Sequence, residues 1–259
     1  MTFQNPRIRV REARLEDKEA IIRIHYAAFD DDVMNRLMYP GGVSEAVKQK
    51  FGDRAFTKPE PGKKGEHRLF IAEYFSPDTH PSFDPETHPD DGSGEVAAFA
   101  KWMFHTEPRT EEEWKAEEFV ATVENFGEGC DLSVVNTFIG GLNGKQKESA
   151  KGEAALFLGI LACDPKRQRL GAGSALVKFG ADIADRLNLP CRLEASPVGY
   201  PVYKRLGYED LDVLDTKVTE TWGVKRDGRY WGANNALDIA GPVPEGVHRT
   251  VIMRRPPKA

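Results

Sequence analysis

Residues 156–187 read LFLGILACDPKRQRLGAGSALVKFGADIADRL and decide the fold. The apolar run at 154–163 predicts a central strand. A core-facing helix follows, because apolar residues recur at spacings of three and four: Leu176, Phe179, Ile183 and Leu187. Between strand and helix, Gly171 and Gly173 let a ligand approach backbone N–H groups that helical hydrogen bonds do not yet use. Such groups at the positive end of a helix hold phosphate.

A second informative segment follows. Cys191–Ala195 predicts a strand, and Tyr200–Leu206 predicts a short helix with Gly207 at its C-terminal cap. Tyr203 lies on that helix, where a phenol could do proton chemistry beside a bound ligand. Together the two segments indicate a coenzyme with a pyrophosphate and a reactive group at its other end.

Two other interpretations of the glycines stay open at this point. One is an ordinary helix start beside a solvated basic turn formed by Lys166, Arg167 and Arg169. The other is a dinucleotide-binding fingerprint, which Glu194 favours because it ends the next strand near the position of a ribose-binding acid. That fingerprint needs a third small residue, however, and Leu176 stands at its position.

The motifs of this segment match a known protein family better than either of these interpretations. Residues 161–165 read LACDP, and Gln168, Gly171 and Gly173 follow with the spacing Gln-x-x-Gly-x-Gly. This arrangement resembles the acetyl-CoA-binding motif of the GNAT superfamily of N-acetyltransferases. Residues 203–208, YKRLGY, resemble the family's Tyr-x-x-x-Gly-Phe/Tyr segment. The order of expected elements fits the family over most of the chain, although the specific motifs lie within 161–208.

The resemblance implies a mixed α/β (α+β) fold, in which a mostly antiparallel, twisted sheet is flanked by helices on both faces. One domain would span residues 1–259, with long insertions near 76–94, 106–152 and 216–247. Acetyl-CoA would be the co-substrate, with no metal. Ser196 falls where many members carry an Asn that contacts the coenzyme. The residues placed at the coenzyme are Leu161, Ala162, Cys163, Gln168, Arg169, Leu170, Gly171, Ala172, Gly173, Ser174, Ser196 and Tyr203.

The resemblance also suggests catalytic roles. Tyr203 matches the tyrosine that often protonates the departing thiolate, and a phenol with a pKa of about 10 carries that proton at neutral pH. The alternative is a helix residue that only packs on the sheet. The base is more open, because 156–163 contains no carboxylate. Glu194 is the nearest candidate, and a water chain to a backbone carbonyl is the alternative.

For the acceptor, Asp30, Asp31 and Asp32 could attract an ammonium group, although each is also an ordinary surface residue. Several aromatic residues could stack on a sugar face or ring: Trp102, Trp222, Tyr230 and Trp231. Long insertions favour a small polar amine, and residues 194–201 resemble fungal members, some of which acetylate amino sugars such as glucosamine. The alternatives are a protein lysine or N-terminal acetyltransferase and a non-catalytic coenzyme A-binding protein.

Composition limits the partners. The net charge of −5 over 259 residues argues against nucleic acid or an anionic membrane as the main partner. Residues 1–6 lack the apolar core of a signal peptide, so the cytoplasm is expected, with the nucleus as the alternative. A homodimer is left open.

Cys163 and Cys191 are interpreted as buried thiols, with a nucleophilic role as the alternative. His80, Asp84, His88 and Asp90 could suggest a metal site, but their spacing fits no known ligand pattern.

The remaining elements follow from periodicity and turn residues. We expect a strand at 8–10, a helix from 16 to 28 that ends at the three aspartates, and a helix at 44–51. We expect strands at 69–74 and 95–104, a helix at 111–123 with its end near Gly127, and closing strands at 208–215 and 250–254. We expect loops at 58–65, 76–94 and 136–152.

Overall fold

The structure is a computed structural model and describes residues 7–57, 65–116, 118–226 and 231–258. The chain divides into two compact units, and each is built from separate stretches of sequence. The first unit comprises Met1–Phe104, Val123–Asp131 and Leu158–Ile183. The second unit comprises His105–Thr122, Leu132–Phe157 and Ala184–Ala259. A single domain over residues 1–259 stays a prediction.

The strands form one seven-stranded sheet with the order β1-β2-β3-β4-β5-β7-β6, and the boundary between the units falls inside β4. The pairings β1–β2, β2–β3, β5–β7 and β6–β7 are antiparallel. The predicted fold class, a mixed and mostly antiparallel sheet with helices, is confirmed. The strands are β1 Ile8–Glu12, β2 Glu66–Tyr74, β3 Glu95–His105, β4 Ala155–Cys163, β5 Cys191–Ala195, β6 Glu209–Thr216 and β7 His248–Arg255.

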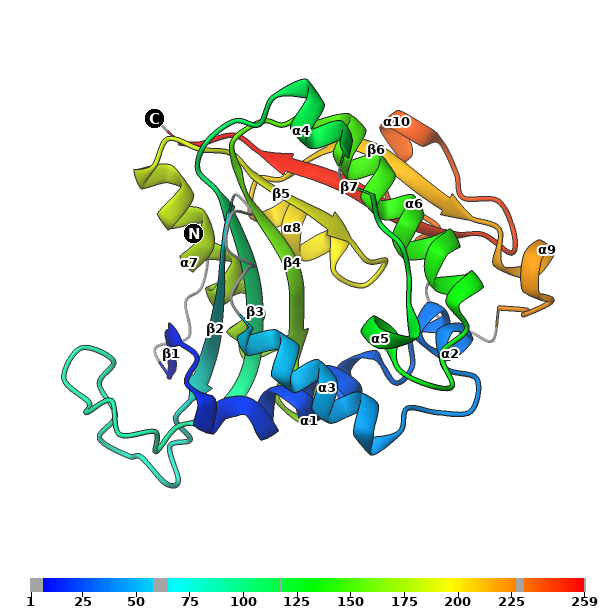
Figure 1. The fold of residues 1–259 in the computed structure, drawn as a ribbon. Helices are drawn as coiled ribbons and strands as arrows, with labels where there is room; N and C mark the ends of the chain where they lie inside the picture. The colour runs from blue at the N-terminus through cyan, green and yellow to red at the C-terminus, as the bar shows by residue number, and fades with distance from the viewer. Residues whose placement is uncertain (1–6, 58–64, 117, 227–230, 259) are drawn as a thin grey trace. The chain divides into compact units, whose positions relative to one another are not determined.

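In the first unit, α1 (Lys18–Phe29) and α3 (Glu45–Phe56) lie side by side (Figure 1). A core of fully buried side chains holds this unit together and includes Ile21, Ile24, Ile71 and Phe99. We expected the second helix to end at residue 51, just before Gly52. It continues because a Cβ at Gly52 would meet the Ile22 side chain at 2.5 Å, so this glycine permits close helix packing.

A short helix between α1 and α3 was not predicted. The three aspartates were expected to end α1 and to attract an amine, but Asp32 begins α2 (Val33–Met38). Its carboxylate accepts the N–H groups of Met34 at 2.9 Å and Asn35 at 3.0 Å. Asp32 is therefore an N-cap.

The insertion at residues 76–94 contains no helix or strand, as predicted. It is tied to β1 by guanidinium groups, since Arg7 donates to the His80 carbonyl and Arg9 donates to the His88 carbonyl at 3.0 Å. Phe75 stacks on Phe83 with ring centroids 3.8 Å apart. Across the described part of the chain, no group of three or more metal-binding side chains is present.

In the second unit, α6 (Leu132–Ala150) lies over β6 and β7 (Figure 1). The prediction of a loop at 136–152 is wrong. Glycines at 140, 141 and 144 suggested a loop, but a Cβ at Gly141 would lie only 3.2 Å from the Leu214 side chain. The missing side chain at Gly141 thus lets the helix approach the strand closely.

The single helix expected from residue 111 is also wrong, because the chain forms two short helices, α4 (Glu111–Ala116) and α5 (Val123–Phe126). Between them the Ala121 N–H donates to the Asn136 side chain at 3.0 Å instead of to a helical carbonyl. The remaining elements are η1 Leu15–Asp17, η2 Pro165–Arg167, α7 Ala172–Arg186, α8 Tyr200–Arg205, α9 Val218–Trp222 and α10 Leu237–Ala240.

The core-facing pattern of α7 holds in part. Leu176 is fully buried, but Leu187 is 47% exposed because the helix ends at Arg186. The loop expected at 58–65 lies outside the described residues except for Gly65, and so does Tyr230. None of the helices within the described ranges is both long and apolar enough to cross a bilayer.

Candidate active site

The glycine turn, residues 164–174, joins β4 to α7 in the first unit. Asp164 fixes its start, because the Asp164 N–H donates to the Ala97 carbonyl at 2.9 Å and its carboxylate accepts the Lys166 N–H at 2.9 Å. Arg23 of α1 pairs with the same carboxylate, whose side chain is only 3% exposed. Burial alone would raise the pKa of Asp164, but the hydrogen bonds from Arg23 and the Lys166 N–H lower the pKa instead.

The middle of the glycine turn adopts left-handed backbone conformations. The φ angle is +66° at Arg169 and +91° at Gly171, the second of which only glycine adopts readily. The first helical hydrogen bond here runs from the Ala175 N–H to the Gly171 carbonyl at 2.9 Å. The N–H groups of residues 172–174 therefore precede the bonding pattern of α7, as an anion-binding turn requires.

Gly173 is required for a different reason from Gly171, namely a lack of space for a side chain. A Cβ at Gly173 would lie 2.9 Å from the Cys163 sulfur, so this position has no room for a side chain. Burial raises the pKa of the Cys163 thiol to about 11, and a hydrogen bond from the Gly173 N–H lowers it only partly. The thiol of Cys163 is therefore protonated at neutral pH, which favours the buried-thiol interpretation over a nucleophile. Burial likewise raises the pKa of Cys191 to about 11.

The basic residues of the glycine turn are not equivalent. Arg167 is paired with Glu95 at 2.7 Å. Lys166 and Arg169 are exposed, and within the described ranges the side chain of neither makes a hydrogen bond or an ion pair. These two cations are thus available to a phosphate group.

In the second unit, α8 carries Tyr203, which is 6% exposed and lies edge-on to Tyr208 with ring centroids 5.8 Å apart. A Cβ at Gly199 would be 3.0 Å from the Tyr203 ring, so this glycine makes space for the tyrosine. Ser196 holds the preceding turn, since its hydroxyl accepts the Gly199 N–H at 3.2 Å and its carbonyl accepts the Tyr200 N–H at 3.0 Å. Ser196 therefore has a structural role at the position where the family resemblance suggests Asn.

Glu194 lies in β5 opposite Ile252 of β7. Burial raises the pKa of its carboxyl group to about 7, yet the residue keeps some accessible surface. Among the residues that the structure describes, no hydrogen bond or ion pair involves the Glu194 carboxyl group. A carboxylate of this kind ionises near neutral pH and is suited to accepting a proton.

The expected acceptor-binding residues differ in burial and in the contacts they make. Trp102 is fully buried, and a Cβ at Gly180 of α7 would meet its ring at 2.3 Å, which accounts for Trp102 by packing. Trp222 is half-buried at the end of α9, and Trp231 is buried. Of the three aspartates, Asp32 caps α2 and Asp30 is exposed at the end of α1.

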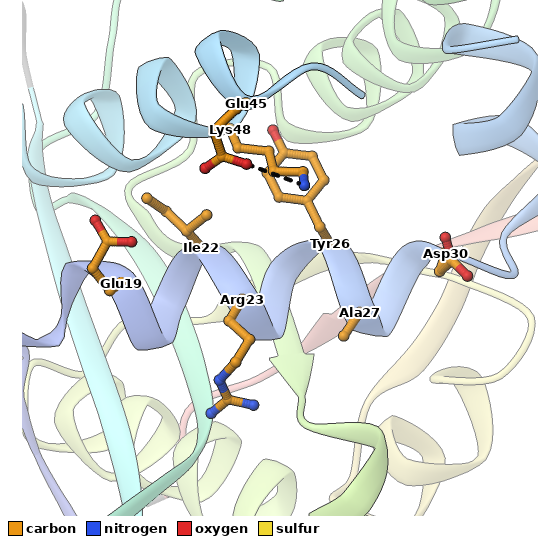
Figure 2. A pocket seen from close by; sticks show the side chains of 8 residues that line it. All are labelled: Glu19, Ile22, Arg23, Tyr26, Ala27, Asp30, Glu45 and Lys48. Carbon is orange, nitrogen blue, oxygen red and sulfur yellow. Dashed lines mark hydrogen bonds and ion pairs between the residues drawn. The ribbon is translucent and has the colours of Figure 1, made fainter. Parts of the chain in front are cut away.

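Asp30 lines a hollow of about 550 Å³ between α1 and α3. Figure 2 shows Glu45 and Lys48 of α3 facing Tyr26 of α1, whereas Arg23 points away from α3. Glu45 and Lys48 pair at 3.4 Å across one helical turn. The hollow carries three acidic and two basic residues: Glu19, Asp30, Glu45, Arg23 and Lys48.

Sequence reasoning missed the ion pair between Arg23 and Asp164. The turn-forming pair Asp164-Pro165 signals the cap, but its cationic partner lies 141 positions away in the sequence. Helix α6, which covers the sheet face that carries Glu194, was also not predicted.

No family model matches this chain. Among similar solved structures, Drosophila melanogaster polyamine N-acetyltransferase, which forms N-acetylagmatine, is 13% identical over 96% of this chain and 99% of its own, with a TM-score of 0.53. An agmatine N-acetyltransferase is 14% identical over 96% and 98%, with a TM-score of 0.52. The C-terminal condensation domain of Ebony, bound to beta-alanyl-dopamine, is 13% identical over 96% and 98%, with a TM-score of 0.52.

These likenesses show the fold. Two of the three matched proteins are named as N-acetyltransferases, and the matches extend over nearly the whole of each chain. The chain shares the fold of these two N-acetyltransferases, and this is the fold that the motifs in its sequence predicted.

Proposed function

We propose that this protein is an acetyl-CoA-dependent N-acetyltransferase. It transfers the acetyl group to the primary amine of a small polar acceptor, by direct attack of the amine on the thioester. The observation that carries the proposal is the glycine turn: a left-handed backbone at Gly171 before α7, with Lys166 and Arg169 exposed beside it, in a chain with the GNAT fold. The proposed reaction uses no metal ion.

The glycine turn binds the coenzyme. Backbone N–H groups of residues 168–174 hold the pyrophosphate, apart from that of Gly173, which is engaged with Cys163. Lys166 and Arg169 neutralise its charge. The backbone of residues 161–163, at the end of β4, holds the pantetheine arm in the manner that the family resemblance implies.

Glu194 and Tyr203 carry the proton chemistry. The acceptor amine must lose a proton to attack, and the carboxylate of Glu194, with a pKa of about 7, accepts it. The tetrahedral intermediate then collapses as the C–S bond breaks. Tyr203 donates its phenolic proton to the departing sulfur, which leaves as the free thiol of coenzyme A.

The acceptor is a small amine. The amino-sugar expectation comes from the sequence resemblance alone, whereas the two acetyltransferases of known structure reported above are named for polyamine and agmatine substrates. We propose a polar primary amine as the class, with agmatine, polyamines and amino sugars as the first compounds to examine.

The test is release of free thiol from acetyl-CoA by the purified protein in the presence of single amines. The panel is agmatine, spermidine, glucosamine, an arylalkylamine and a lysine peptide. Amine-dependent release with a small amine supports the proposal, and a preference for the peptide points to a protein acetyltransferase. Binding of acetyl-CoA without release by any amine identifies a non-catalytic coenzyme A-binding protein and overturns it.

A further inference from the structure

One face of the β5–β7–β6 sheet carries polar groups in its interior. In the antiparallel register, Glu194 lies opposite Ile252, and Thr250 lies opposite Leu214. Directly opposed residues share a face, and so do residues two positions apart on one strand. Glu194 and Thr250 therefore share this face as diagonal neighbours on adjacent strands, a geometry with a typical separation of about 7–8 Å.

Helix α6 covers the same face. Its Lys145 pairs with Asp212 of β6 at 2.8 Å, and its Ser149 contacts Arg192 of β5 through a hydrogen bond. Gly141 abuts Leu214, which is opposite Thr250. The helix therefore crosses from β6 at its middle to β5 at its C-terminal end.

These contacts also place Gln146. Successive residues of an α-helix turn by about 100°, so Ser149 lies about 40° beyond Lys145 and Gln146 lies about 100° beyond it in the same sense. Because that sense of rotation leads from β6 towards β5, Gln146 faces the β5 side of α6. It precedes Ser149 by nearly one turn, at the level of Glu194 rather than of Arg192.

Glu194, Gln146 and Thr250, which we call the polar patch, have side-chain oxygen atoms that lack hydrogen-bond partners. The Thr250 hydroxyl and the Gln146 amide oxygen are buried and have no hydrogen-bond partner in the described part of the chain. Glu194 has none within the described residues, and Thr250 is 3% exposed. A buried polar atom without a partner costs stability, so three on one surface indicate a ligand that supplies the missing donors.

We propose that the polar patch of Glu194, Gln146 and Thr250 is the acceptor subsite, and that Gln146 and Thr250 determine specificity. This inference rests on the proposed acetyl transfer. The amine that Glu194 deprotonates satisfies only one of the three oxygens. The acceptor therefore carries a second N–H or O–H donor that can reach Thr250 or Gln146 while the reacting nitrogen lies at Glu194, as diamines, guanidino-amines and amino sugars do, and plain alkylamines do not.

Thr250→Val tests this subsite, because it removes the hydroxyl and keeps the shape. We expect the KM for agmatine, or for whichever donor-bearing amine the panel identifies, to rise on the order of tenfold, with the Kd for acetyl-CoA unchanged. Gln146→Leu should act in the same direction. Thr250→Ser, which retains the hydroxyl, should restore most of the loss.

The choice of acceptor provides the second arm. With hexylamine, which has no second donor, the Thr250→Val protein should lose at most about twofold relative to wild type. An unchanged KM for the donor-bearing amine in both Thr250→Val and Gln146→Leu overturns the subsite. An equal loss with hexylamine also overturns it, because the effect then does not depend on the second donor.

Binding separates this inference from the proposed function. If no amine releases thiol, calorimetric titration of agmatine into wild type and Thr250→Val is still informative. Weaker binding to the variant supports an amine subsite in a protein that is not an acetyltransferase. Equal binding, or no binding to wild type, overturns the subsite as well.

Discussion

The glycine turn and helix α6 use the same amino acid for opposite purposes. At Gly171 the backbone has a φ of +91°, so the chain leaves regular structure and exposes N–H groups. At Gly141 the backbone stays helical, and the absent side chain lets α6 approach Leu214 of β6. These two glycines both permit close approach to the backbone, and neighbouring residues decide whether a ligand or a strand makes that approach.

The same contrast extends to function. The glycine turn belongs to the first unit and is proposed to bind the coenzyme, while Glu194, Tyr203 and the polar patch belong to the second unit and are proposed to handle protons and the acceptor. Substitutions in the first region should change the affinity for acetyl-CoA. Substitutions in the second should change turnover or acceptor recognition and leave that affinity intact.

The largest effect is expected from Tyr203→Phe, which removes the proposed acid. Loss of a positioned proton donor typically lowers a rate by about 10²–10⁴-fold, so kcat should fall in that range while the Kd for acetyl-CoA stays constant. Steady-state kinetics and calorimetry measure the two quantities. Tyr200→Phe, on the same helix, is the matched control, since it removes only the hydroxyl that donates to Asp210 at 2.8 Å. Equal kcat values for wild type and Tyr203→Phe would eliminate the acid role.

Glu194→Gln should change how stability depends on pH. Burial raises the pKa of Glu194 from 4.5 to about 7, so the folded state binds more protons than the unfolded state between these values. Wild-type stability therefore falls as pH rises from 4.5 to 7, by about 3 kcal/mol for this group. The amide of Gln cannot ionise. The stability of Glu194→Gln relative to wild type should therefore increase between pH 5 and pH 8.

Urea unfolding at the two pH values measures this difference. Glu153→Gln is a useful control, because ion pairs with Arg254 and Arg192 lower the pKa of Glu153 despite its burial, so the effect of this substitution should not change between pH 5 and pH 8. A Glu194→Gln effect that is the same at both pH values would show that Glu194 has an ordinary pKa.

A smaller effect is expected from Arg23→Ala, which removes the cation that pairs with Asp164 at the start of the glycine turn. Arg23 is half-exposed, so the pair should contribute no more than about 1 kcal/mol. The affinity for acetyl-CoA should fall about two- to fivefold, and Arg23→Lys should recover part of it. A calorimetric Kd in Arg23→Ala equal to that of wild type would show that the pair does not position the turn.

The smallest effects compare two glycines of α6. A Cβ at Gly144 would contact nothing within 4 Å, so Gly144→Ala should stabilise the protein by about 0.5–1 kcal/mol through helix propensity. A Cβ at Gly141 would press on Leu214, so Gly141→Ala should be neutral or destabilising. Thermal unfolding ranks the two variants. The opposite order would contradict the close packing of α6 on β6.

Sequence reasoning succeeded where the signal is local. The apolar run at β4 and the strand at Cys191–Ala195 were predicted because each carries its own signature and is bounded by Pro or Gly. The turn between β4 and α7 was found because Gly171 and Gly173 stand at a fixed spacing after Gln168. Both are properties of a few adjacent residues.

The prediction from sequence failed where contacts with residues distant in the sequence determine the local structure. Helix α6 is rich in glycine and polar residues, and only its contact with β6 shows why those glycines are helical. Asp32 was expected to attract an amine, but the N–H groups of α2 use its carboxylate. The lack of a partner at Thr250 is a tertiary property, which the sequence cannot indicate.

The role of the glycine turn in coenzyme binding is tested most directly by calorimetric titration of acetyl-CoA into wild type and Gly173→Glu, with Gly144→Ala as the control. We expect saturable binding to wild type and to the control. We expect no measurable binding to Gly173→Glu, because a side chain there meets the Cys163 sulfur and blocks the glycine turn. Absence of binding to wild type, or wild-type affinity in a folded Gly173→Glu protein, would contradict this role.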